Sequence, residues 1–147
     1  MIEKLELETI IDINEEIYLR SLENDQIEYG SRFEYPILKS NIECLIRYSP
    51  DGDIINIASY YLKNIILLQS FPDANHRTAL ISATLFLNKN GRNLHYSDTD
   101  AVKFQKEMYS LRLKTYGHYG SHSVDVLVEE RNDVDDLCRE FIEEHLV

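Results

Sequence analysis

Residues Gln69–Leu80 read QSFPDANHRTAL, and this polar stretch stands between two apolar segments. Before it, apolar residues recur over 54–68 at helical spacing and form a broad face, which predicts a central helix beginning near Asp53. Pro72 disfavours a helical conformation at Phe71, so this helix is expected to end at the FPDA turn. The central helix and the turn that follows it therefore decide the fold.

A second apolar helix is expected directly after the turn. Its apolar positions recur at helical spacing from about Asn75 through Phe86. Asn90 and Gly91 follow this run, and an Asn-Gly pair in that place is a typical C-terminal stop of a helix. The turn therefore leads into a helix N-terminus, the end of a helix that attracts anions.

The flanking sequence adds further helices. Apolar spacing predicts a helix over Thr9–Leu22 and an acidic helix over Asp133–His145. A further helix is expected from Pro36 to the turn Ser49–Gly52, with an inner face made of Leu38, Ile42, Leu45 and Ile46. Another is expected from the N-cap cluster Ser97–Asp100 to about Leu113. Only Lys4–Glu8, KLELE, alternates as a strand does. Thr115–Ser123 is expected to be a loop, and Gln26–Tyr35 a loop or small hairpin. The predicted fold is all-α, one compact domain over residues 1–147 with about six or seven helices.

The composition is that of an ordinary globular chain. Of its 147 residues, 44% are apolar and 28% are charged, and no uncharged apolar run reaches the roughly 18 residues of a membrane span. The acidic N-terminus lacks the basic flank and apolar stretch of a signal peptide, so a cytoplasmic protein is expected. Cys44 and Cys138 are too few and too far apart for a disulfide framework or a metal site, and we expect free thiols.

The charge is unevenly distributed along the chain. A net charge of −11 argues against binding to nucleic acid or to an anionic membrane. Residues 1–62 hold 5 basic and 13 acidic side chains and residues 125–147 hold 2 and 9, whereas residues 63–114 hold 8 and 4. This basic middle contains the quoted stretch, and a small anion such as a nucleotide would be attracted there. Chance clustering on solvated helix faces is the alternative.

The loop residues have the chemistry of an anion site. Backbone N–H groups around Ala74–Arg77 have no partner inside the helix, and the helix dipole adds positive charge. Arg77 would hold phosphate oxygens with two parallel hydrogen bonds. Asp73 would cap the helix or bind Mg²⁺, and Asn75 would cap or contact a phosphate. Phe71 is expected to point inward and anchor the turn. The alternative is an ordinary capped turn with a solvated arginine.

The stretch FPDANHRTAL, followed by an apolar helix that ends in LNKNG, resembles the signature of the Fic/Doc (Fido) family. The family pattern is H-x-F-x-[D/E]-G-N-[K/G]-R, and the continuation R-T-A-L with a final N-G is typical of its Doc (death-on-curing) branch. The likeness covers about Gln69–Gly91. It implies a compact helical fold and the transfer of AMP or a terminal phosphate from a nucleotide such as ATP to a protein hydroxyl group.

The resemblance also implies roles for individual residues. Asp73 would bind Mg²⁺, and Phe71 would be the structural anchor. A strand-like flap that aligns a target segment would lie within Gln26–Tyr35. A Doc-like protein further implies a small antitoxin-like protein partner. Whether the chain forms a homo-oligomer is left open by the resemblance. The residues that would bind the nucleotide phosphates are Ala74, Asn75, His76 and Arg77.

The chain departs from the family pattern where the acid–base chemistry is done. The family's histidine, the general base, falls on Gln69, whose amide cannot accept a proton near neutral pH, and loss of a general base costs roughly 10²–10⁴-fold in rate. The family's glycine falls on Ala74, which costs on the order of 1 kcal/mol if the turn needs a positive φ. The Doc-type lysine falls on His76. Leu80 stands where Fic members carry a second phosphate-binding arginine, which favours the Doc branch.

The histidines offer no clear replacement for the missing base. His76 would be a substitute base or a titratable phosphate contact, but it lies on the wrong side of the loop for a simple exchange with Gln69. A hydrogen-bond donor in place of the lysine, or a plain surface histidine, fits better. His118 and His122 are four residues apart, and without a carboxylate in register they do not predict a metal site.

Three functions follow as alternatives. The first is a Doc-like phosphotransferase or nucleotidyltransferase that works at a reduced rate. The second is an inactive Fido-fold protein that still binds a nucleotide or a protein partner through Asp73, Asn75 and Arg77. The third is a helical interaction module without nucleotide affinity. Gln69 favours the second alternative over the first, and the three retained phosphate ligands argue against the third.

Overall fold

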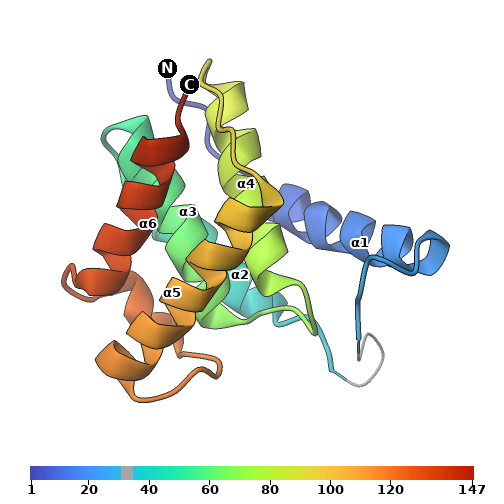
Figure 1. Cartoon of the computed structure of the whole chain (residues 1–147). Helices are drawn as coiled ribbons and strands as arrows, with labels where there is room; N and C mark the ends of the chain where they lie inside the picture. The colour runs from blue at the N-terminus through green and yellow to red at the C-terminus, as the bar shows by residue number, and fades with distance from the viewer. Residues whose placement is uncertain (31–34) are drawn as a thin grey trace.

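The computed structural model describes residues 1–30 and 35–147, and this part of the chain is all-helical, as predicted (Figure 1). An isolated β-bridge between Leu94 and Leu146 is its one extended pairing. Six α-helices and one short 3₁₀ helix follow one another in the described residues: α1 (Leu7–Glu23), α2 (Lys39–Arg47), α3 (Ile54–Leu68), α4 (Asn75–Lys89), α5 (Asp98–Tyr116), η1 (Val124–Val128) and α6 (Asp133–His145).

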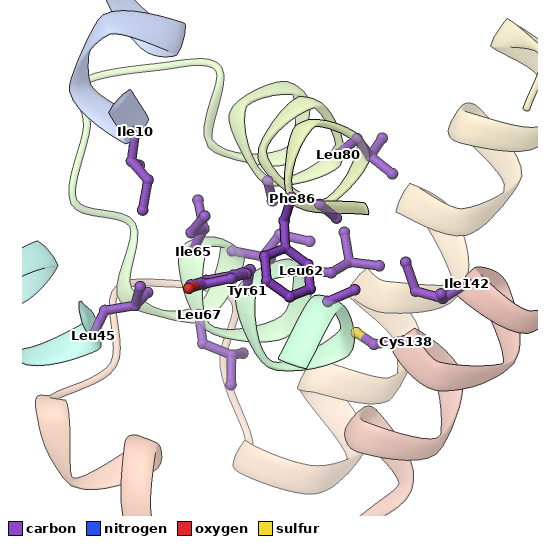
Figure 2. Close-up of a cluster of buried hydrophobic side chains, with 14 of the residues drawn as sticks. Ile10, Leu45, Tyr61, Leu62, Ile65, Leu67, Leu80, Phe86, Cys138 and Ile142 are labelled. Carbon is purple, nitrogen blue, oxygen red and sulfur yellow. The ribbon is translucent and has the colours of Figure 1, made fainter. Parts of the chain in front are cut away.

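Helix α3 is the centre of the molecule. Ile57, Leu62 and Ile66 are fully buried, and α3 packs most extensively against α4 and α6. Figure 2 shows this core, with side chains of α3, α4 and α6 meeting around Leu62. The Asp53 carboxylate caps the helix by accepting a hydrogen bond from the Asn56 N–H at 2.8 Å. Because α3 is apolar on nearly all sides, it is stable only inside the molecule, which is what its sequence predicted.

Helix α2 begins later than predicted. Pro36 is not its first residue, because α2 starts at Lys39. The Leu38 N–H donates a hydrogen bond to the Ser70 carbonyl at 2.8 Å. This contact holds the chain before α2 against the loop that follows α3. Leu38 has a ψ of 72°, outside the helical range, so the helix cannot include the residues before Lys39.

The strand-like alternation of Lys4–Glu8 does not form a strand. Helix α1 begins at Leu7, and the residues before it have no regular structure. The Leu5 N–H donates to the Tyr61 hydroxyl at 3.1 Å, and the Leu5 side chain is buried in the core. An alternating pattern becomes a strand only where a second strand pairs with it, and here a tyrosine side chain takes the hydrogen bond instead.

Two predicted loops need comment. Within Thr115–Ser123, the first two residues belong to α5, which ends at Tyr116 and is followed by Gly117 with a φ of 82°. The segment Gln26–Tyr35 was predicted to hold a loop or hairpin flap. Its residues 26–30 and 35 contain no strand, and residues 31–34 lie outside the described part of the chain.

Two expectations about the whole chain can be compared with the structure. Cys44 and Cys138 are free thiols, as predicted, and Cys138 is buried. Among the helices of residues 1–30 and 35–147, none combines the length and the apolar composition that a membrane crossing requires.

Candidate functional site

The loop between α3 and α4 has an unusual backbone. Gln69 has a φ of 47° and a ψ of 48°, and Ala74 has a φ of 62° and a ψ of 29°. They are the two non-glycine residues with positive φ in the described part of the chain. This conformation costs an L-residue roughly 1–2 kcal/mol and is natural for glycine. Ala74 therefore occupies a position with positive φ, where the resemblance to the Fic/Doc family led us to expect a cost for alanine.

Asn75 and Phe71 lock the loop. Asn75 is 7% exposed, and its side-chain oxygen accepts a hydrogen bond from the Phe71 N–H at 3.2 Å while its amide nitrogen donates to the Phe71 carbonyl at 3.0 Å. The Phe71 side chain is 5% exposed and belongs to the core. The loop therefore uses the Asn75 side chain for its own hydrogen bonds, and what Asn75 offers a ligand is its backbone N–H.

The Gln69 side chain is held by its surroundings. Its amide nitrogen donates to the Ile66 carbonyl at 2.7 Å, so it caps the last turn of α3. Its oxygen accepts a hydrogen bond from the Asn75 amide at 3.3 Å. An amide in this arrangement fixes the loop but has no basic nitrogen for proton transfer.

Asp73 and Arg77 both contact the segment that follows α1. One Asp73 carboxylate oxygen accepts from the Gly30 N–H and the other from the Ala74 N–H, each at 2.7 Å. The Arg77 guanidinium donates to the Glu28 carbonyl at 2.6 Å. The two charged side chains of the loop therefore hold main-chain groups from a distant part of the sequence.

A pocket of about 570 Å³ opens beside this loop. The first turn of α4 faces the same region, and it has no side-chain cap, in contrast to the N-termini of α3, α5 and α6. Within the described residues, the N–H groups of Asn75, His76 and Arg77 form no hydrogen bond. The pocket lining includes Asp73, Asn75, His76 and Arg77, and Val102 and Tyr109 of α5.

His76 lies in the pocket wall with its ring nitrogens buried and without partners among the described residues. Its ring packs against Tyr109, with centroids 5.3 Å apart. Burial, with a smaller contribution from the Arg112 guanidinium, lowers the pKa of His76 to about 4. The imidazole is therefore neutral at neutral pH, which makes it a hydrogen-bonding group and a weak base.

Asp73 fits Mg²⁺ as a single ligand. Each of its carboxylate oxygens accepts one N–H and keeps a further lone pair. No group of three or more His, Cys, Asp or Glu side chains in residues 1–30 and 35–147 is placed to hold a metal ion. Mg²⁺ would take its remaining ligands from phosphate oxygens and water, which is its usual way of binding beside a nucleotide.

His118 and His122 do meet in the structure. Their rings are stacked with centroids 4.3 Å apart, and His122 is 8% exposed. Burial, the neighbouring His118 and Arg112 lower the pKa of His122 to about 4. No third His, Cys, Asp or Glu side chain in the described residues completes a metal-binding group with them.

The sequence analysis assigned no role to two buried polar residues: Asn14, which holds the loop between α3 and α4, and Arg112, which holds the segment that follows α5. Asn14 is fully buried and donates to the Asp73 carbonyl at 2.9 Å and to the Thr78 hydroxyl at 3.0 Å. Arg112 is fully buried, forms no ion pair in the described part of the chain, and donates to the carbonyls of Tyr119 and Gly120. Each is a polar residue at an inward position of a helical repeat, which is the signal that could have found them.

In comparisons with protein-family models, curated proteins and solved structures, none matches this chain. The likeness to the Fic/Doc family therefore rests on the residues of the loop and of α4.

Proposed function

We propose that this chain binds the phosphates of a nucleotide such as ATP, together with Mg²⁺, at the N-terminus of α4, as its likeness to the Fic/Doc family implies. One observation carries the proposal: the backbone of Ala74 has the positive φ that the family glycine would adopt, directly before an uncapped helix. A turn of this shape presents free backbone N–H groups to an anion.

The side chains around the turn support the same ligand. Asp73 supplies one oxygen for Mg²⁺, and Arg77 supplies a planar guanidinium for phosphate oxygens. The volume of the adjoining pocket, about 570 Å³, is in the range of small-molecule sites. Mg²⁺, when bound, would neutralise part of the phosphate charge.

In the active form of this proposal, a hydroxyl oxygen of a target protein attacks a phosphorus atom of the nucleotide. A P–O bond breaks, and the leaving group is pyrophosphate if AMP is transferred or a nucleoside diphosphate if the terminal phosphate is transferred. The hydroxyl proton needs an acceptor. Gln69 cannot take it, and the lowered pKa of His76 makes that imidazole a weak acceptor.

The second candidate is therefore an inactive Fido-fold protein that binds a nucleotide or a protein, such as an antitoxin-like partner, without group transfer. The bonds of the Gln69 amide to the Ile66 carbonyl and the Asn75 side chain favour it. They give Gln69 a structural role in the place where the reaction needs a base.

A thermal-shift measurement with ATP and Mg²⁺ tests the binding. We expect a rise in Tm for the wild type and no rise for Arg77→Ala, since a ligand stabilises only a fold that binds it. Arg92→Ala is the matched control, because Arg92 is exposed and follows the opposite end of the same helix. A wild type whose Tm is unchanged at millimolar ATP would contradict the proposal.

A labelling experiment separates the enzyme from the binder. ATP labelled at the α- or the γ-phosphate is incubated with a cell lysate and either the wild type or Gln69→His. Label transferred only by the histidine variant identifies a fold that has lost its base, and histidine is among the residue types that tolerate the φ of this position. Label transferred by the wild type identifies an active enzyme, and the labelled phosphate shows which group moves.

A further inference from the structure

Residues Gln26–Gly30, here called the strap, lie beside the candidate site. After α1 the chain turns back toward the loop between α3 and α4 (Figure 1). Gln26 lines the same pocket as the loop residues. Gly30 and Glu28 are the strap residues whose backbone groups are bound by Asp73 and Arg77.

Within residues 1–30 and 35–147, a few polar contacts hold the strap. Besides the Gly30 and Glu28 contacts, the Tyr29 hydroxyl donates to the side-chain oxygen of Asn14 at 2.8 Å. The Tyr29 ring also packs edge-on against Tyr18, with centroids 5.3 Å apart. None of the five strap residues is buried. A segment that adds nothing to the core and is tied by a few hydrogen bonds opens at low free-energy cost, while the core remains folded.

The strap occupies the two side chains that a phosphate–Mg²⁺ ligand would use. The Gly30 nitrogen lies 2.7 Å from one Asp73 oxygen, so it takes one of the two lone pairs of that oxygen and narrows the approach of a cation or its water to the other. Arg77 donates one N–H of its guanidinium to the Glu28 carbonyl, and that edge of the guanidinium is not available to a phosphate while the strap is closed. Closed strap and bound ligand therefore compete for the same groups.

We propose that the strap covers Asp73 and Arg77 in the resting chain and is released when an anionic ligand enters, so that it regulates access to the site. The part that concerns nucleotides rests on the proposed function. A closed strap lowers the apparent affinity by the fraction of molecules in which it is open. Loosening it therefore strengthens binding without altering any residue of the loop.

The chain offers a matched pair of variants for the test. Gly30→Pro removes the N–H that Asp73 accepts. Gly30→Ala keeps that N–H, and its added Cβ would lie 3.7 Å from the Asp73 carboxylate, an ordinary contact distance. Tyr29→Phe loosens the strap through another residue, by removing the hydroxyl that reaches Asn14. Tyr29→Phe replaces Gly30→Pro in the test if circular dichroism shows that the proline variant is unfolded.

The first readout needs no nucleotide. The rate at which phenylglyoxal modifies Arg77 is followed by mass spectrometry of the full chain after digestion. We expect Gly30→Pro to react about tenfold faster than the wild type, since loss of one charge-assisted hydrogen bond is worth about a factor of ten. Tyr29→Phe should react several-fold faster, because the hydrogen bond that it loses joins two neutral groups. Gly30→Ala should react like the wild type. Equal rates of Arg77 modification in all four proteins would contradict the proposal that the strap covers Arg77.

The second readout is calorimetric binding of Mg·ATP. We expect about tenfold tighter binding to Gly30→Pro than to Gly30→Ala. Equal affinities would overturn regulation by the strap and leave the proposed nucleotide site standing. If no variant binds Mg·ATP, the nucleotide function fails and the regulatory role fails with it. Faster Arg77 modification then still supports the strap as a cover of these side chains, so the two failures are told apart.

Discussion

Ala74 carries backbone strain in a buried turn. It is 6% exposed and has a φ of 62°, so replacing it with glycine relieves roughly 1–2 kcal/mol of strain and loses the burial of one methyl group, about 0.8 kcal/mol. We expect Ala74→Gly to be about 0.5 kcal/mol more stable than the wild type in urea unfolding.

Ala83→Gly is the control for this prediction. Ala83 is fully buried in the interior of α4, where glycine costs about 1 kcal/mol in helix propensity besides the lost methyl group. The two Ala→Gly changes should therefore have opposite signs. A destabilised Ala74→Gly variant would show that the turn does not strain alanine.

His76 predicts a dependence of stability on pH. Burial, with Arg112 nearby, lowers the pKa of His76 in the folded chain to about 4. Below about pH 6.5 the unfolded chain takes up a proton on this residue, whereas the folded chain does so only near pH 4. The contribution of His76 to the free energy of unfolding is therefore fully present above pH 6.5. It decreases as the pH falls toward 4, by about 2 kcal/mol between pH 7 and pH 4.5.

The measurement compares urea unfolding of the wild type and His76→Gln at pH 7 and pH 4.5. We expect the variant to lose about 2 kcal/mol less than the wild type on acidification, because glutamine does not titrate. His95→Gln, a change at an exposed histidine, is the control and should leave the difference in place. Equal losses in wild type and His76→Gln would show that His76 is not the titrating group.

At the scale of elements, the join between α3 and α4 depends on one side chain. Asn75 satisfies both the N–H and the carbonyl of Phe71, which is buried. We expect Asn75→Ala to lower the free energy of unfolding by about 2–3 kcal/mol, because two buried backbone groups lose their partner. Asn88→Ala, at an exposed position of the same helix, should change it by less than about 0.5 kcal/mol.

Chemical denaturation of both variants measures this difference. An Asn75→Ala variant as stable as Asn88→Ala would mean that water replaces the Asn75 side chain in the loop. Its amide would then be available to a phosphate, as the family resemblance implies.

At the scale of the whole molecule, Lys63 ties the central helix to the C-terminal part of the chain. Lys63 is 4% exposed, and its ammonium nitrogen lies 3.0 Å from Asp135 of α6 and 3.5 Å from Glu129. We expect Lys63→Ala to cost about 2–3 kcal/mol, because it leaves two partly buried carboxylates without their cation. Lys103→Ala breaks an exposed pair with Glu107 and should cost less than about 1 kcal/mol.

Thermal and urea unfolding of the two lysine variants test this. Similar losses would show that the Lys63 pair is solvated like a surface ion pair. A much larger loss for Lys63→Ala, with a single cooperative transition, would show that α3 and α6 unfold together.

Much of this fold was predictable because its signals are local. Ser97 and Asp100 form the capping box that their spacing suggested, and α6 occupies Asp133–His145 as predicted. The start of α2 was not predictable from Pro36. Leu38 has a non-helical ψ of 72° where the chain bonds to Ser70, a residue distant in the sequence.

The sequence by itself determined the helices, the polar turn between α3 and α4 and the residues gathered there, because caps and apolar spacing act over a few neighbouring residues. Only the tertiary structure decided what those residues touch. Asp73 and Arg77 bind backbone groups 43 and 49 residues away, and Arg112 is buried against a loop. Such contacts depend on how the packed core places distant segments, and a short sequence pattern does not predict that placement.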